Sequence, residues 1–180
     1  MSKTLVIVAH PNLTNSRINK RWVEALRQHP EHITVHDLHA SYPDGRIDAP
    51  AERALIEAHQ HIVFQFPMFW FSTPAFLKQW IDEVVTFGWA YGPGGDKFEG
   101  KSLMLAYSTG GTVEAYQAGG QNHFSPSELT KWLELTAIFV RAKFLPSHIL
   151  HGAGHGLSDE ALEESTKAYI SRLVKSEVNS

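Results

Sequence analysis

A polar segment at residues 10–19 (HPNLTNSRIN) follows a short apolar run near the start of the chain. The hydroxyls of Thr14 and Ser16, the guanidinium of Arg17 and the free amides at the start of a helix would together bind a phosphate. The segment is not a P-loop, because it lacks the glycine-rich spacing and the Gly-Lys-Ser/Thr ending. Asn15 or Ser16 could instead be only the N-cap of the helix. The residues therefore indicate an anion site, with a capping role as the alternative.

An aromatic segment lies at residues 61–80 (HIVFQFPMFWFSTPAFLKQW), where an apolar run leads into a loop with Phe69, Trp70 and Phe71. Exposing three aromatic side chains to water is unfavourable, and in open α/β sheets ligands bind at the carboxyl ends of strands. We therefore expect a planar heterocycle with carbonyl and nitrogen acceptors to dock at this loop. A subunit contact or a core turn is the alternative.

A glycine pair follows another apolar run, in the segment Ser108-Thr109-Gly110-Gly111-Thr112. Glycines let a ligand approach the backbone closely, and we expect the amides of Thr109 and Gly110 to be free to donate to it. A glycine pair by itself more often only makes a turn.

Short apolar runs without in–out alternation predict strands that are covered on both faces, at residues 5–9, 33–35, 62–66, 103–107 and 139–150, the last with a proline interruption. Helix-period segments alternate with them, at residues 18–28, 51–58, 74–87, 126–136 and 159–175. With 43% hydrophobic residues, a chain of 180 residues suits one buried core. Right-handed crossovers then predict a single α/β, flavodoxin-like domain over residues 1–180, with a five-stranded parallel sheet of order 2-1-3-4-5 and helices on both faces.

Two helix starts have local signals. Ser125 and Glu128 form a capping-box pattern around a proline. Pro74 is expected at the first position of the helix after the aromatic loop, behind a cap from Ser72 or Thr73.

The three ligand-type segments follow the first, third and fourth predicted strands, whose carboxyl ends would lie side by side in this sheet order. A phosphate at the first segment, a flat ring at the second and amides at the third describe a flavin mononucleotide site. A nicotinamide site is the weaker hypothesis, because no G-x-G-x-x-G follows any predicted strand.

Composition and motifs exclude other classes. The chain has no cysteine, so disulfides, thiolate nucleophiles and cysteine-ligated metals are excluded. A net charge of −3 argues against nucleic acid as a partner. No G-x-S-x-G elbow is present. His148, His151 and His155 have no carboxylate between them, so we predict surface or capping histidines and no metal site. The start, MSKTLVIVAHP, has no cleavage site typical of a secretory signal, which predicts a first strand in a cytoplasmic protein.

With these residues in place, residues 5–173 resemble the flavodoxin-like NAD(P)H:quinone oxidoreductases, the DT-diaphorase family, and within it the small bacterial branch of YwrO and KefF type. The resemblance is carried by the polar loop with His10, Ser16 and Asn19, the block FQFPMFWF at residues 64–71, and the segment STGG at residues 108–111 with Tyr116 after it.

The resemblance implies roles for individual residues. The flavin phosphate and ribityl chain would be held by His10, Ser16, Arg17 and Asn19. The isoalloxazine ring would be lined by Pro67, Met68, Phe69, Trp70 and Phe71, and its pyrimidine end would face Ser108, Thr109, Gly110 and Gly111. Tyr116 would handle protons during hydride transfer, together with His123 as the candidate histidine.

The resemblance also implies a function. FMN is the expected cofactor, with FAD as the alternative, and NADPH or NADH is the electron donor. A quinone or related electrophile would then be reduced by two electrons at the same ring face, which predicts ping-pong kinetics. The alternative is a regulatory flavoprotein subunit, docked peripherally on a glutathione-gated potassium efflux system in the membrane.

A homodimer is also expected, in which the glycine-rich segment 88–100 of one subunit helps to close the other subunit's site. Trp89, Tyr91 and Phe98 in this segment are expected to be exposed aromatic surface that a free monomer would not tolerate.

Overall fold

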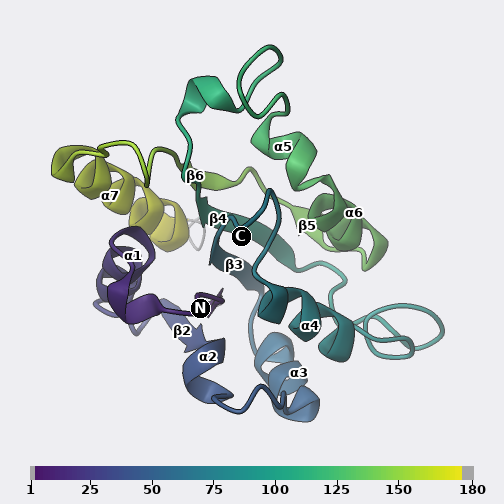
Figure 1. The fold of residues 1–180 in the computed structure, drawn as a ribbon. Helices are drawn as coiled ribbons and strands as arrows, with labels where there is room; N and C mark the ends of the chain where they lie inside the picture. The colour runs from purple at the N-terminus through teal and green to yellow at the C-terminus, as the bar shows by residue number, and fades with distance from the viewer. Residues whose placement is uncertain (1–2, 176–180) are drawn as a thin grey trace.

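The computed structural model describes residues 3–175, which form a parallel sheet with helices on both faces (Figure 1). The strands are β1 (Thr4–Val8), β2 (Ile33–Asp37), β3 (His61–Pro67), β4 (Ser102–Ser108), β5 (Lys143–Phe144) and β6 (His148–Leu150). The sheet order is β2-β1-β3-β4-β5, and β6 also pairs with β4. The predicted flavodoxin-like order is therefore confirmed.

The helices are α1 (Ile18–Leu26), α2 (Leu38–Ser41), α3 (Ala49–Glu57), α4 (Ala75–Val84), α5 (Pro126–Leu129), α6 (Lys131–Phe139) and α7 (Asp159–Lys175), with short 3-10 turns η1 (Leu13–Asn15) and η2 (Val113–Ala115). Figure 1 shows α1 and α7 on one side of the sheet and α3, α4, α5 and α6 on the other. The short α2 was missed in the sequence pattern; the side chain of Asp37 caps it by accepting from the amides of His39 and Ala40.

Strand β1 is buried along its whole length, as its continuous apolar sequence predicts. Because successive side chains point to opposite faces, Leu5 and Ile7 pack in the core beneath α3, α4 and α6, whereas Val6 and Val8 pack against α1 and α7. Two cores, one on each face, therefore fix the height and orientation of β1.

The predicted last strand, at residues 139–150, was wrong at its start, whereas its predicted interruption by a proline is confirmed. Phe139 is the last residue of α6, and the strand position is divided between β5 and β6, which both pair with β4. Pro146 lies between the two short strands and has no N–H to donate to a sheet ladder. The interruption therefore follows from the proline.

The start of α4 also differs from the prediction. Pro74 is the N-cap and has extended backbone (ψ 145), the helix begins at Ala75, and no side chain in the described part of the protein caps it. The capping box of Ser125 and Glu128 is confirmed, since each side chain bonds the other residue's backbone amide.

Glu52 of α3 anchors α4 below the aromatic loop. Its carboxylate is buried and accepts hydrogen bonds from Trp80 Nε1 (2.7 Å), Tyr42 OH (2.6 Å) and His36 Nε2 (2.7 Å). Burial acts to raise the pKa of Glu52, but the three donors outweigh it and the pKa lies below its ordinary value. A charged, fully bonded carboxylate thus ties α3, α4 and β2 together.

Candidate functional site

The loops after β1, β3 and β4 lie side by side at the carboxyl edge of the sheet. Strand register continues beyond the strands, because Ala9 N donates to Gln65 O (2.9 Å) and Met68 N donates to Ser108 O (2.8 Å). Thr109 N donates to Leu150 O at 3.0 Å. The expectation that the Thr109 amide is free was therefore wrong: the neighbouring strand β6 takes it.

The loop after β1 begins α1. Ser16 Oγ accepts from Asn19 N at 3.1 Å, so Ser16 caps the helix. The Arg17 guanidinium turns toward the start of α7, where it bonds Leu157 O (2.5 Å) and Asp159 Oδ1 (2.6 Å). Ser16 is half-buried and Arg17 is exposed. The Arg17 guanidinium is therefore paired with the Asp159 carboxylate and does not point to the loop after β1.

A pocket of about 440 Å³ lies between the first turns of α1 and α7. Its lining includes Thr14, Ser16 and Lys20 from the first loop and helix. It also includes the carboxylates of Glu24, Asp159 and Glu163, of which the last two pair with Arg17 and Arg21. The amides of Arg17 and Ile18 donate to no acceptor among residues 3–175. Hydroxyls, a lysine and the open end of a helix are a donor set that suits a phosphate.

His10 stands at the start of the same loop and is half-buried. Its Nδ1 accepts from Asn12 N at 3.0 Å. Burial, followed by the neighbouring charge of His39, lowers the pKa of His10. His10 is therefore neutral at pH 7, with its proton on the other ring nitrogen, which can donate to an anion.

The aromatic loop after β3 is a tight hairpin. Phe69 and Ser72 exchange two backbone hydrogen bonds, of 2.9 and 3.0 Å. The two residues between them, Trp70 (φ 46) and Phe71 (φ 63), both have left-handed backbone. A two-residue turn of this kind usually contains Asn and Gly, and such strain costs roughly 1–3 kcal/mol per residue. The strained hairpin displays the Trp70 ring, whose residue is 92% exposed.

The base of this loop is buried. Pro67 is buried and Met68 is 9% exposed. Below them, the rings of Phe66 and Tyr107 stack with their centroids 5.3 Å apart. Pro67 and Met68 thus form a rigid support, and the exposed surface comes from the three aromatic residues.

A buried polar chain connects the loops after β1 and β4. Asn19 Nδ2 donates to Ser108 Oγ (3.0 Å), and Gln65 Nε2 donates to Asn19 O (3.1 Å). Tyr169 OH of α7 donates to Gln65 Oε1 (3.4 Å). All four residues are buried. Asn19 and Ser108 therefore lie under the site and position its loops.

The glycine segment after β4 is open. A Cβ at Gly110 would meet nothing within 4 Å, and one at Gly111 would lie 3.1 Å from the Tyr116 ring. The amides of Gly110 and Gly111 have no acceptor in the described part of the chain. Thr109 is 1% exposed, and its hydroxyl donates to Gly111 O at 3.0 Å.

His151 was missed as a site residue in the sequence pattern. Its Nδ1 lies 2.9 Å from Thr109 Oγ1, and its ring lies beside that of Tyr116, with centroids 5.7 Å apart. His123 is exposed and has left-handed backbone (φ 60). No hydrogen bond or ring contact between His123 and Tyr116 occurs within residues 3–175. In the sequence, the one feature that could have indicated His151 as a site residue was its position directly after the last predicted strand.

These residues fit a flavin mononucleotide. The donor set at α1 suits its phosphate, the aromatic hairpin offers a flat apolar surface, and the unpaired glycine amides and open space at Gly110 suit its ring carbonyls. Among the described residues, no group of three or more His, Asp or Glu side chains could hold a metal ion. Within residues 3–175, no helix has both the length and the apolar character that a membrane crossing requires.

A parallel sheet of order β2-β1-β3-β4-β5, with polar, aromatic and glycine loops at its carboxyl edge, defines a flavodoxin-like protein. The chain belongs to the Flavodoxin_2 family, described as a flavodoxin-like fold, whose model matches residues 2–173.

Relatives and solved structures agree with this family. YdeQ of Bacillus subtilis, named as an uncharacterized NAD(P)H oxidoreductase, is 49% identical over 98% of this chain and 89% of its own length. The potassium-efflux ancillary protein KefG of Erwinia tasmaniensis is 39% identical over 93% of this chain and 90% of its own. The general stress protein 14 of Treponema denticola, solved in complex with FMN, has a TM-score of 0.89 and 43% identity, covering 95% of this chain and 97% of that one. An NADPH-quinone reductase from P. pentosaceus has a TM-score of 0.86 and 32% identity over the same shares.

Proposed function

We propose that this protein is an FMN-dependent NAD(P)H oxidoreductase that reduces quinones or related electrophiles by two electrons. The observation that carries the proposal is the arrangement of three loops at one sheet edge, with a phosphate-type donor set, an exposed aromatic hairpin and unpaired glycine amides. The structure of an FMN-bound relative at 43% identity and the names of YdeQ and the P. pentosaceus reductase support it.

The residues have distinct roles in this proposal. Thr14, Ser16 and the first amides of α1 hold the phosphate, and His10 donates to it from Nε2. Arg17 would reach the phosphate only after its ion pair with Asp159 breaks. In the observed conformation it neutralises the Asp159 carboxylate near the site. The buried Asn19 and Ser108 set the spacing between the phosphate loop and the glycine loop.

The ring-binding residues lie on the next two loops. Phe69, Trp70 and Phe71 supply a flat apolar wall, which Pro67 and Met68 support from below. Gly110 and Gly111 direct amides at the ring's pyrimidine end, where they stabilise negative charge as an oxyanion hole does. Bound FMN would supply reversible hydride chemistry. Because the fold offers one edge for both substrates, NAD(P)H and the acceptor use it in turn.

A homodimer is part of the proposal. Of the three aromatic residues expected at its interface, Tyr91 is half-buried and lines the groove described below, whereas Phe98 is buried and Trp89 packs on it. Phe98 is 1% exposed, and the Trp89 indole donates to Glu57 Oε1 (2.7 Å) and packs edge-on against Phe98. Away from the candidate site, four exposed apolar residues gather on and beside α6: Phe87 (67%), Leu135 (63%), Ile138 (58%) and Phe139 (62%).

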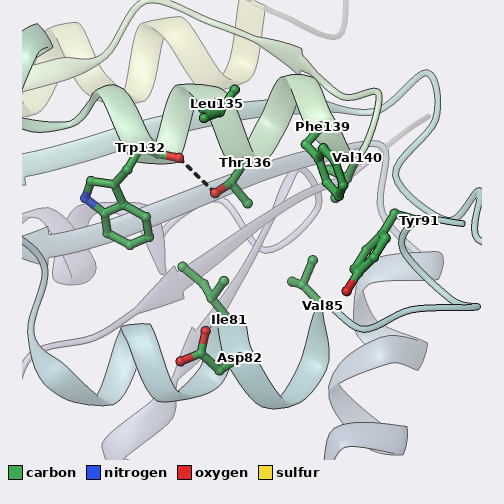
Figure 2. Close-up of a pocket in the computed structure, with 9 residues that line it drawn as sticks. All are labelled: Ile81, Asp82, Val85, Tyr91, Trp132, Leu135, Thr136, Phe139 and Val140. Atoms are coloured by element: carbon green, nitrogen blue, oxygen red, sulfur yellow. Dashed lines mark hydrogen bonds between the residues drawn. The ribbon is translucent and has the colours of Figure 1, made fainter.

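These residues adjoin an apolar groove of about 560 Å³ between α4 and α6. Figure 2 shows Ile81 of α4 and Val85, just after α4, facing Trp132 and Thr136 of α6, with Tyr91 beside Phe139. These apolar side chains form one contiguous surface and are not scattered singly. A second copy of the chain would bury this surface.

The segment 88–100 supports an arrangement in which subunits complete each other's sites. It lies beyond the far end of α4, where Gln60 Nε2 donates to Gly100 O and Arg141 donates to Gly95 O. This is the amino edge of the sheet, opposite the candidate site. The segment could therefore contribute only to a partner's site.

A regulatory role is the second candidate. The identity of 39% with KefG favours it, since KefG is named as an ancillary protein of a glutathione-regulated potassium-efflux system. Binding to membranes that contain such a system, without any dependence of its flux on NAD(P)H oxidation, would favour this role over catalysis.

The decisive experiment is an absorbance spectrum of the purified protein, followed by mass measurement of the released flavin and an assay of NAD(P)H oxidation with a quinone. Bound FMN and quinone-dependent oxidation are expected. No flavin bands and no quenching of FMN fluorescence on titration would contradict the proposal.

A further inference from the structure

His151 lies on the loop that follows β6 and crosses beside the glycine segment of β4. This loop is held there by backbone bonds, because Gly152 N donates to Gly111 O (2.8 Å) and Ala153 N donates to Thr109 O (3.0 Å). The half-buried His151 thereby reaches both the hydroxyl of Thr109 (2.9 Å) and the ring of Tyr116 (5.7 Å between centroids).

The hydrogen bonds of Thr109 determine which ring nitrogen of His151 carries the proton. Thr109 Oγ1 lies 3.0 Å from Gly111 O and donates its single proton to that carbonyl. If the hydroxyl proton pointed elsewhere, Thr109 Oγ1 and Gly111 O would face each other with lone pairs only. His151 Nδ1 must therefore be the donor in its 2.9 Å bond to Thr109. A neutral His151 then keeps its lone pair on Nε2, which has no partner in the described part of the chain.

We infer that His151, beside Tyr116, is the histidine that supplies the proton in the acceptor half of the reaction, in place of His123. This inference rests on the oxidoreductase function proposed above. His151 has a defined tautomer, a fixed hydrogen bond to the glycine loop and a ring contact with Tyr116. His123 is exposed and has neither contact.

The chemistry requires one such proton in each cycle. Overall, NAD(P)H, one proton and a quinone give NAD(P)⁺ and a hydroquinone. The nicotinamide loses a hydride, which accounts for two electrons and one proton, and the second proton comes from water. His151 Nε2 takes up this proton, and the N–H bond breaks as an O–H bond forms on the quinone oxygen that becomes negative.

The surroundings of His151 suit a proton donor. Burial lowers its pKa, while the carboxylate of Glu114, the one charged group within residues 3–175 that acts on it, has the opposite effect. The uncharged Thr109 and Tyr116 occupy its other contacts. A protonated His151 is therefore a stronger acid than a free imidazolium and transfers its proton readily.

His151→Gln tests the inference, because glutamine keeps a donor for Thr109 but does not titrate near neutral pH. The rate at which a quinone oxidises the NAD(P)H-reduced, FMN-loaded protein is measured by stopped flow from about pH 5 to 8. The wild-type rate should rise as the pH falls toward the His151 pKa. In His151→Gln the rate should be lower by about 10²-fold at the acid end and independent of pH.

His155→Gln is the matched control, because His155 is an exposed histidine of the same loop. It should keep the wild-type pH profile. A second readout needs no flavin: ¹⁵N NMR of the histidine rings in the FMN-free protein should show His151 as the Nδ1–H tautomer, with a titration midpoint below 6.5.

Several outcomes separate this inference from the proposed function. An active wild type together with a wild-type pH profile in His151→Gln would overturn the inference alone. So would an Nε2–H tautomer, or loss of the pH dependence in His123→Gln with retention in His151→Gln. A wild type that neither binds FMN nor oxidises NAD(P)H would overturn the proposed function and this role of His151 with it.

Discussion

Asn19 in the first turn of α1 donates a hydrogen bond from Nδ2 to Ser108 Oγ at the end of β4, over 3.0 Å and across 89 residues of sequence. Both side chains are buried, with Asn19 1% and Ser108 6% exposed. This bond sets the distance between the phosphate-type loop and the glycine loop.

Asn19→Ala should weaken FMN binding more than it weakens the fold. The change leaves the Ser108 hydroxyl without its donor, which costs about 1–3 kcal/mol of unfolding free energy. It also frees the two loops to separate, so the FMN dissociation constant should rise, as measured by fluorescence quenching. Thr166→Val removes a buried hydrogen bond inside α7 and is the control. Equal FMN affinities in the two variants would contradict this positioning role.

Tyr116→Phe should slow the chemical half-reactions while FMN affinity stays nearly unchanged. Tyr116 is 8% exposed, and general acid–base help is worth about 10²–10⁴-fold; we expect the low end because water can replace the hydroxyl at an open site. Stopped-flow measurements of flavin reduction and reoxidation test this. If Tyr116→Phe leaves both rates at the wild-type values while Tyr116→Ala releases flavin and lowers the melting temperature, the ring has a packing role only.

Steady-state kinetics should follow a ping-pong pattern, because one sheet edge serves both substrates. Double-reciprocal plots of NAD(P)H oxidation at several fixed quinone concentrations should be parallel. Lines that intersect to the left of the axis would indicate a ternary complex and a separate nicotinamide site.

Leu135→Asp should convert a dimer into a monomer. Leu135 is 63% exposed at the α4–α6 groove, so a carboxylate there would be buried without a partner in a dimer. Light scattering should give twice the chain mass of 20.2 kDa for the wild type and the single chain mass for the variant. Ala168→Asp, at an exposed position of α7, should leave the mass of the wild type unchanged. A wild type of 20.2 kDa at micromolar concentration would contradict the dimer.

Acid should destabilise the fold through His148. This residue is 8% exposed and stacks on Tyr169 with centroids 4.8 Å apart. Burial, followed by the charge of Arg172, lowers its pKa to about 4. The unfolded chain, with a pKa near 6.5, binds this proton more readily, so stability is present above pH 6.5 and is lost as the pH falls toward 4, by about 3 kcal/mol.

The measurement for His148 is urea unfolding at about pH 7 and 5. His148→Gln should lose part of this pH dependence, whereas His155→Gln, at an exposed position, should keep it. Identical pH dependence in all three proteins would show that His148 does not control acid stability.

The fold and the sheet edge that carries the candidate site could be predicted from local sequence pattern. Continuous apolar runs alternating with helix-period segments predict a parallel sheet, and parallel strands bring their carboxyl ends to one edge. The loops that carry His10, Trp70 and Gly110 were therefore predicted to meet, and they do. These features depend on local pattern and on the handedness of crossovers, which a single sequence displays.

Which groups remain available for chemistry depends on long-range packing and could not be predicted from local pattern. The Thr109 amide is taken by Leu150, Arg17 is paired with Asp159, and Phe98 is buried. His151 was grouped with surface histidines, yet the loop after β6 brings it against Tyr116. Each outcome depends on a partner far away in sequence, whose position is set by packing on the sheet and not by any local spacing.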